Sequence, residues 1–487
     1  MRPGPLTLLL ASGAFAVAIG VASATADSGP SVRFRPATTG LFRPTSVAVT
    51  GLSARSVEVR LKGATDAAGL AYEWTPYRWR RLRLSDGAWT GALPAPALLG
   101  LYELQLRVDG SRRILQSPHW LLRVFQPPAA VYDAVTKLEG RYVPYHDFAA
   151  TVVPGASVQA AVAAAAQTTL DHYLPDQQPA VDAEYGTYLA KLTGDVPDGV
   201  AVGQAAADDI IAMRTGDGRN AATPTYGTIG PIVPGQWQLQ SAAQTAQTPW
   251  VATFRPFVLE RPSQFRVGPP PALTSEQYAK DLNETEAYGA ADSTVRTKAE
   301  TDTAFFWNAN AVNQYNGAMQ NAATENGLDL VDAAHLFAMG ELTTADAGIA
   351  CWDSKYFYLA WRPITAIQDA GLDGNDATTA DLGWTPLLST PTHPEYPAAH
   401  GCLSSAFSDT LAAALGSNRL NITIPGSTGG GTTLTTSRVY GNVQDIQNEI
   451  VNARVWAGLH FRNSVVQGER LGNQVAAYDL GQAFQPS

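Results

Sequence analysis

The chain has 487 residues and a formal net charge of −10, and hydrophobic residues make up 45% of it against 16% charged residues. This length predicts two or three domains, and the composition predicts packed cores rather than a disordered chain. The acidic balance argues against nucleic acid as a partner, because a phosphate backbone is bound by a basic surface.

The N-terminus has the pattern of a secretory signal peptide, with one arginine, an apolar stretch and the small-residue ending Ala24-Thr25-Ala26. We expect residues 1–26 to be removed by cleavage after Ala26. A membrane anchor is the alternative, but the apolar run is interrupted by Ser and Gly and is short for a bilayer span. No later segment has the length and apolarity of a span, so we expect a secreted or periplasmic protein whose mature chain has no transmembrane segment.

Residues 31–127 alternate apolar and polar residues in short runs such as "SVEVRLKG" and "LYELQLRVDG", with turn residues between them. Regularly spaced short strands predict a small β-sandwich-like domain of immunoglobulin-like size. Trp79 and its neighbouring arginines could bind a ligand, but a strand with one solvated face accounts for them equally well. The segment "FQPPAAV" then predicts a linker.

Residues 130–487 are alanine-rich with apolar residues at helical spacing, which predicts an α-helical domain. Loop "GSTGGGTT" lacks the Gly-Lys-Ser/Thr ending of a phosphate loop and predicts a surface loop. Cys351 and Cys402 could form a disulfide in an exported protein. The preferred interpretation is that both are small, buried hydrophobic residues without a bond between them. The expected helices are roughly 157–174, 180–192, 199–214, 274–288, 293–324, 328–361, 398–415 and 441–457.

The first candidate motif is "KYFYLAWRP", which ends at Pro363. Lys355 and Arg362 are seven residues apart, so on one helix both project from the same face, and Pro363 then ends that helix. Two cations on an otherwise buried helix need an anion or carboxylates to compensate them. Two snorkelling cations at the bundle surface are the structural alternative.

The second motif is "HPEYPAAHG", in which His393 and His400 are two of only seven histidines in the chain. Pro394 and Pro397 hold the chain extended between them, and His400 falls at the start of an expected helix. Free N–H groups and the helix dipole favour an anion there, and His400 could exchange a proton with it. A histidine that caps the helix or packs in the core is the alternative.

The third motif is "NARVWAGLHFRNS", in which Gly458 separates Arg454 from His460. On one unbroken helix the two would lie on different faces, but the glycine allows a break after which His460 can point back toward the arginine. Together the three motifs bring cations, histidines and a helix N-terminus to one place, which predicts a site for a tetrahedral or trigonal oxyanion. A neutral imidazole there can act as a nucleophile or a metal ligand.

The three motifs resemble, in order and spacing, the three-part signature of the vanadium-dependent haloperoxidase and type 2 phosphatidic acid phosphatase superfamily. They correspond to Lys-x6-Arg-Pro, then a segment like Pro-Ser-Gly-His, then Arg-x5-His. The resemblance covers roughly 130–487, where "DAGIACWDSKYFYLAWRPITAI" is similar to secreted bacterial members, and it does not cover 31–127. It implies a mainly α fold, a helical bundle of the acid phosphatase/vanadium haloperoxidase type preceded by the small β-sandwich-like domain. It also implies vanadate or phosphate bound in one pocket.

The resemblance assigns Lys355, Arg362 and Arg454 to the equatorial oxygens of the bound anion. It makes His460 the residue bound to the metal in haloperoxidases, or the nucleophile in phosphatases. Lys355 would also withdraw charge from the bound substrate, so we count it among the catalytic residues.

The second motif carries further roles and one departure. By the resemblance His400 is the acid–base histidine, the Ala399 N–H contacts an oxygen, and His393 stands where bromoperoxidases of the family have a second histidine. The family serine that donates to an oxygen is Ala398 here, and loss of such a bond to a charged group costs roughly 1.5–3 kcal/mol. The acid that orients the last motif histidine in many phosphatases is Ser464 here.

The resemblance implies a haloperoxidase-like enzyme that uses vanadate to oxidise halide, bromide in preference, with hydrogen peroxide. The first alternative is an acid phosphatase that hydrolyses a phosphate ester with His460 as nucleophile, with phosphate in place of vanadate. The second is a non-catalytic oxyanion-binding protein, toward which Ala398 and Ser464 point. A homodimer is compatible with the sequence.

Overall fold

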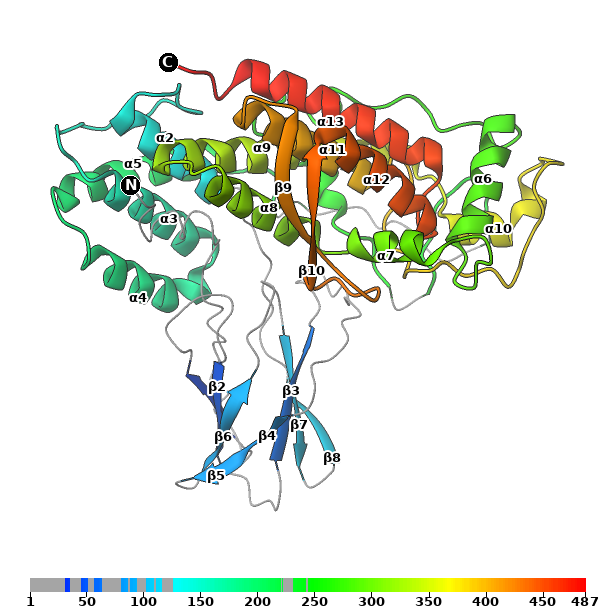
Figure 1. The fold of residues 1–487 in the computed structure, drawn as a ribbon, viewed down its shortest axis with the longest axis horizontal. Coiled ribbons are helices and arrows are strands. Elements are labelled where there is room, and N and C mark those ends of the chain that lie inside the picture. The colour runs from blue at the N-terminus through cyan, green and yellow to red at the C-terminus, as the bar shows by residue number, and fades with distance from the viewer. Residues whose placement is uncertain are drawn as a thin grey trace. The chain divides into compact units, whose positions relative to one another are not determined.

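The computed structural model describes eight strands between Ser31 and Leu115, and the chain from Gln126 onward except residues 220, 222–230 and 242–243. The expected signal peptide, 1–26, lies outside the described residues. The chain divides into two compact units. Figure 1 shows its elements coloured by residue number. Unit 1 holds the described residues up to Ala134 together with Phe148–Ile211, and unit 2 holds Val135–Asp147 together with Ala212–Ser487.

The strands of unit 1 form two four-stranded sheets with antiparallel neighbours, in the orders β1-β2-β6-β5 and β4-β3-β7-β8. The expected alternating strands therefore form and pair, whereas their packing as one sandwich-like domain, 31–127, stays a prediction, as does the boundary of the domain 130–487. The strands are β1 Ser31–Arg35, β2 Thr45–Thr50, β3 Val57–Gly63, β4 Arg80–Arg81, β5 Arg83–Ser85, β6 Ala88–Leu93, β7 Tyr102–Val108 and β8 Ser111–Leu115.

The segment predicted as a linker, "FQPPAAV", is instead the start of helix α2, Gln126–Glu139. Prolines in the first turn of a helix cost no hydrogen bond, because those N–H groups have no intrahelical partner, and their fixed φ suits the helix. The alanine-rich segments of unit 1 form helices as expected: α3 Val158–Tyr173, α4 Gln178–Leu189 and α5 Val196–Met213.

Unit 2 is a helical bundle with one β-hairpin, β9 Arg419–Gly426 paired antiparallel with β10 Thr436–Asn442. The loop "GSTGGGTT" connects these two strands, which the sequence analysis did not predict. The helices of the bundle are α6 Glu276–Gly289, α7 Lys298–Phe306, α8 Ala311–Glu325, α9 Leu330–Tyr358, α10 Pro363–Gln368, α11 Ala399–Ala414, α12 Val443–Trp456 and α13 Arg462–Gln482. A short 3-10 helix, η2, spans Pro249–Thr253.

Two expected helix boundaries are wrong. The predicted helix 293–324 is two helices, because α7 ends before the buried Trp307, and Asn310 starts α8 by accepting the N–H of Asn313 with its side chain. The predicted helix 328–361 ends at Tyr358, where Leu359 takes a left-handed conformation with φ 50°. No proline or glycine marks either break, so the apolar spacing alone suggested continuous helices.

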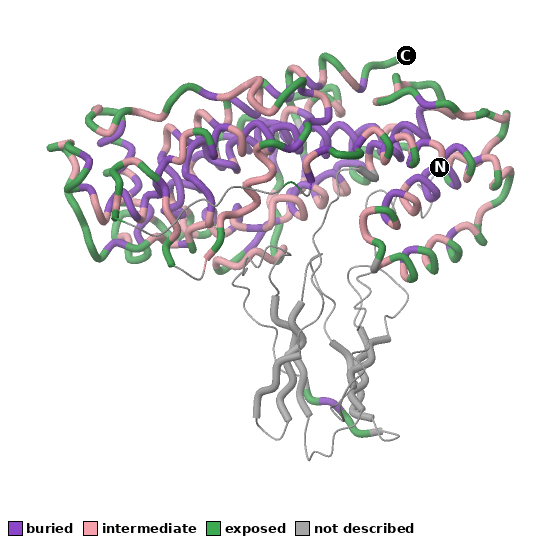
Figure 2. Tube along the Cα trace, turned by 180° about the vertical axis from the view of Figure 1, so that it is seen from behind, coloured by how far each residue is buried: buried purple, intermediate pink, exposed green. Residues whose placement is uncertain are grey.

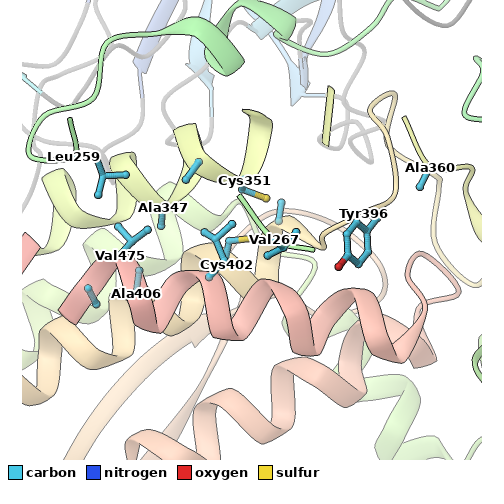
Figure 3. Close-up of a cluster of buried hydrophobic side chains, with 13 residues drawn as sticks. Leu259, Val267, Ala347, Cys351, Ala360, Tyr396, Cys402, Ala406 and Val475 are labelled. Carbon is cyan, nitrogen blue, oxygen red and sulfur yellow. The ribbon is translucent and has the colours of Figure 1, made fainter. Parts of the chain in front are cut away.

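Helix α11 lies at the centre of the bundle and packs against both α9 and α13. Buried residues follow these helices through the interior of unit 2 (Figure 2). The shared core includes Cys351 from α9, Cys402 and Ala406 from α11, and Val475 from α13 (Figure 3). Both cysteines are free and buried, as the preferred interpretation expected.

The contact between α11 and α13 depends on small residues. A Cβ atom at Gly401 would lie 2.5 Å from the carbonyl oxygen of Val465, and one at Gly468 would lie 2.5 Å from that of Ala398. The helices therefore approach so closely that backbone meets backbone, which holds the start of α11 firmly against α13. In the part of the chain that the structure describes, no helix has the length and apolarity to cross a membrane.

We expect Gly472→Ala to destabilise unit 2, because a methyl group there would press against the carbonyl oxygen of Cys402. Overpacking of this kind costs about 1–3 kcal/mol. The matched control is Gly481→Ala on the same helix, where an added Cβ meets nothing within 4 Å. The control should keep or slightly raise the midpoint of urea unfolding; equal midpoints for both variants would contradict the close packing.

Candidate functional site

The loop that carries His393 is held between two parts of the bundle. The N–H of Glu395 donates to the carbonyl of Ala360 at 2.9 Å, and the N–H of Ala398 donates to the carbonyl of Ser464 at 3.0 Å. Helix α11 begins directly afterwards, at Ala399, as expected. The loop thus brings its own carbonyl groups and the first turn of α11 to one place.

Lys355 and Arg362 do not share one helix, contrary to the expectation. Lys355 lies in the last turn of α9, whereas Arg362 follows the break and is the extended residue before α10, with φ −82° and ψ 155°. Helix α9 has already ended at Tyr358, and Pro363 disfavours a helical conformation in Arg362 and starts α10.

Both cations nevertheless reach the same loop. Lys355 Nζ donates to the carbonyl oxygens of Pro394 and Glu395, each at 2.9 Å, and Arg362 Nε donates to that of His393 at 2.8 Å. Neither cation is exposed at all, which excludes the alternative of snorkelling surface cations. The loop carbonyls partly replace the water that burial removes.

Arg362 also joins two histidines. Its Nη1 lies 3.1 Å from Nε2 of His460 and donates to the carbonyl of Leu459 at 2.9 Å. Its Nη2 lies 3.0 Å from Nδ1 and 3.2 Å from Nε2 of His393. His393, whose ring centroid is 5.1 Å from that of Trp352, is therefore part of the site and not a distant loop residue.

Glu395 is a site residue that the sequence analysis missed. Its Oε1 accepts a hydrogen bond from Nδ1 of His460 at 2.8 Å and another from the N–H of Phe461 at 3.2 Å. The available signal was a carboxylate inside the motif "HPEYPAAHG", between the two prolines. His460 itself lies in the connection between α12 and α13, after Gly458, whose φ is 73°.

Arg454 and His400 form the other side of the site. Arg454 Nη1 donates to the carbonyl of Trp307 at 3.2 Å, and desolvation lowers the pKa of His400 although a hydrogen bond to the backbone of Trp307 opposes this. Nε of Arg454 and Nε2 of His400 are both buried without a hydrogen-bond partner among the described residues. Buried polar atoms are normally paired, so these two atoms fit an anion that carries oxygen acceptors.

Burial controls the charges of the site. Desolvation lowers the pKa of Lys355 to about 8, that of Arg362 to about 10 and that of Arg454 to about 9. Since the two arginines keep their charge at neutral pH, and the lysine is mostly charged there, cations concentrate in a small buried volume. Such a group is stable only if an anion compensates it.

The histidines of the site are neutral at neutral pH. Desolvation, followed by the neighbouring cations, lowers the pKa of His393, His400 and His460 well below the usual value. Desolvation also raises the pKa of Glu395 to about 7. A neutral imidazole nitrogen has a lone pair. The cations of the site can therefore bind the oxygens of an oxyanion while an imidazole nitrogen contacts its central atom.

A family model described as the VCPO second helical-bundle domain matches residues 335–485, which include all three motifs. A stretch of 82 residues is 34% identical to vanadium chloroperoxidase from Curvularia inaequalis. The part of the chain that carries the three motifs is therefore similar to the vanadium haloperoxidases. The matched stretch is 15% of this chain and spans only 13% of that relative's length.

Solved structures of vanadium haloperoxidases share the fold. The crystal structure of the first bacterial vanadium-dependent iodoperoxidase matches with a TM-score of 0.63 and 23% identity, over 74% of this chain and 90% of that one. The holo-type bacterial vanadium-dependent chloroperoxidase matches with a TM-score of 0.54 and 21% identity, over 72% and 88%. These likenesses show a similar, mainly helical fold.

We expect Arg454→Ala to weaken the binding of a simple tetrahedral anion such as phosphate by more than tenfold, or about 1.4 kcal/mol. The variant removes a buried cation whose Nε has no partner among the described residues. Calorimetric titration measures the effect, and Arg470→Ala, at an exposed position of α13, controls for net charge. Unchanged affinity in the Arg454 variant would exclude this arginine from the anion site.

Proposed function

We propose that this chain is a vanadate-dependent haloperoxidase-like enzyme that oxidises halide, bromide in preference, with hydrogen peroxide. The observation that carries the proposal is the buried set of three cations around a neutral imidazole, His460, whose Nδ1 is already engaged by Glu395. The similarity of residues 335–485 to vanadium haloperoxidases supports vanadate as the anion of this set. The signal-peptide pattern of residues 1–26 supports export of the protein.

The residues present fit the cofactor. Lys355, Arg362 and Arg454 would donate to the oxygens of vanadate together with the N–H of Ala399, and Nε2 of His460 would be the metal ligand. The unpartnered Nε of Arg454 is the structural sign that an acceptor belongs there. When bound, vanadate would supply a Lewis acid that activates peroxide without a change of oxidation state.

The chain's own residues supply proton handling and charge. His400, neutral and with an unpartnered Nε2, can accept a proton from a peroxide molecule that enters the site and return it later. Lys355, held by two loop carbonyls, keeps a positive charge in the site that favours negative charge on a substrate oxygen. Ala398 contributes no side-chain donor at the start of α11, so the N–H groups of the first turn serve alone.

A parallel assay of the purified full chain tests the proposal. Bromination of a phenol with vanadate and peroxide is compared with hydrolysis of a phosphate ester without vanadate. We expect vanadate-dependent bromination and negligible hydrolysis, with bromide oxidised faster than chloride. Hydrolysis alone would favour the acid phosphatase, whereas binding of vanadate without either reaction would favour a non-catalytic oxyanion-binding protein.

We expect His460→Ala to abolish vanadate binding, because the variant removes the only imidazole bonded to Glu395 among the described residues. Titration of the apoprotein with vanadate, followed by absorbance, gives the affinity. His172→Ala, at an exposed position of α3, is the control. Retained vanadate affinity would show that another residue is the ligand.

His393→Ala should change the halide kinetics while it largely preserves vanadate affinity. His393 reaches the site through Nη2 of Arg362 and does not replace His460. The same titration, combined with bromide and chloride rates, separates the two roles. Equal loss of vanadate binding in both histidine variants would mean that the ligand is misassigned, and unchanged kinetics would make His393 a packing residue.

A further inference from the structure

Glu395 contacts two functional parts of the site at once. Its carboxylate accepts from Nδ1 of His460 at 2.8 Å and from the N–H of Phe461 at 3.2 Å. Its backbone carbonyl accepts from Nζ of Lys355 at 2.9 Å and from Oγ of Ser464 at 3.4 Å. With its side chain only 2% exposed, one residue links the cation at the end of α9 to the histidine before α13.

We propose that Glu395 is the positioning residue of His460 and takes the place of the carboxylate that many phosphatases of the superfamily have at the position of Ser464. The inference deepens the proposed function, on which it rests for the role of His460 as vanadate ligand. Glu395 comes from the loop before α11, whereas position 464 belongs to the first turn of α13. In this chain a side chain from the loop before α11, and not one from α13, thus orients the imidazole of His460.

The hydrogen bonds around His460 select one tautomer. An ionised Glu395 carboxylate can only accept, so Nδ1 of His460 then carries the proton of the 2.8 Å bond. Arg362 Nη1 is a donor, so Nε2, 3.1 Å away, must offer its lone pair. Both partners therefore favour the tautomer whose Nε2 is unprotonated and carries the lone pair that a metal would need, and a carboxylate partner makes that nitrogen more basic.

A role for Glu395 as a mere counter-charge fits the contacts less well. In the described part of the chain, its carboxylate is hydrogen-bonded to the neutral His460 at 2.8 Å and forms no ion pair with Lys355 or Arg362. Both cations donate instead to backbone carbonyls of residues 393–395. The carboxylate is thus directed at the imidazole although two cations lie nearby.

The experiment compares vanadate with sulfate, because sulfate is held by the cations alone whereas vanadate also needs Nε2 of His460. Glu395→Ala should lower vanadate affinity by about 10–100-fold, the usual effect of losing the partner of a metal-bound histidine. Sulfate affinity should change much less, because Lys355, Arg362 and Arg454 remain. Calorimetry gives both affinities. Their ratio separates the contribution of the His460 imidazole from that of the positive charge of the site.

A second readout needs no vanadate. Nitrogen-15 shifts of the labelled His460 imidazole report which nitrogen carries the proton. The wild type should show protonated Nδ1, and Glu395→Ala should show a mixture or the other tautomer. Glu395→Gln, which keeps an acceptor oxygen and the shape, should retain the tautomer but lower the vanadate-to-sulfate ratio by at least about threefold, since a neutral acceptor bonds more weakly.

Rescue distinguishes positioning from folding. Ser464 donates to the backbone of Glu395, so position 464 is close enough for a carboxylate to be tried there. Glu395→Ala combined with Ser464→Asp should recover a large part of the lost vanadate-to-sulfate ratio and the protonated Nδ1. If the double variant recovers neither the affinity ratio nor the protonated Nδ1, a carboxylate at position 464 cannot replace Glu395, which would count against the proposal.

The outcomes separate the two proposals. An unchanged tautomer of His460 and an unchanged ratio of vanadate to sulfate affinity in Glu395→Ala would overturn the role of Glu395. If Glu395→Ala does not fold, an unchanged ratio in Glu395→Gln would overturn it equally. A wild type that binds sulfate and vanadate equally would overturn the proposed function, while the imidazole shifts would still decide whether Glu395 positions His460.

Discussion

The burial of three cations in one small volume is the constraint on which the rest of unit 2 depends. Lys355, Arg362 and Arg454 are at most 2% exposed, and desolvation lowers the pKa of each. Removing such charges from water is costly, so the fold supplies carbonyl oxygens of residues 393–395, Leu459 and Trp307 as partial replacements. The remaining positive charge gives the site its preference for an anion.

This constraint explains why the bundle packs as it does. The loop carbonyls can serve the cations only if the start of α11 stays close to α13, and the glycines at 401, 468 and 472 permit that approach. The breaks at Leu359 and Gly458 turn the chain so that Arg362 and His460 face the same loop. Irregular backbone at the ends of regular helices thus places most of the functional groups.

The two departures from the family signature have different consequences. Ala398 leaves the start of α11 without a side-chain cap and has no hydroxyl that could donate to an anion. At Ser464 the fold does offer a replacement, because Glu395 reaches His460 from another segment. A substitution that seems to remove a function in one motif can therefore be balanced by a residue in a different one.

The sequence by itself determined the helical character of the C-terminal part, the start of α11 and the cations and histidines of the site, since apolar spacing, proline and charge act locally along the chain. Only the tertiary structure decided that Arg362 leaves α9, that 293–324 is two helices, and that Glu395 meets His460. Glu395 and His460 are 65 positions apart, so no local pattern encodes their contact, and neither helix break carries a proline or glycine where the helix ends.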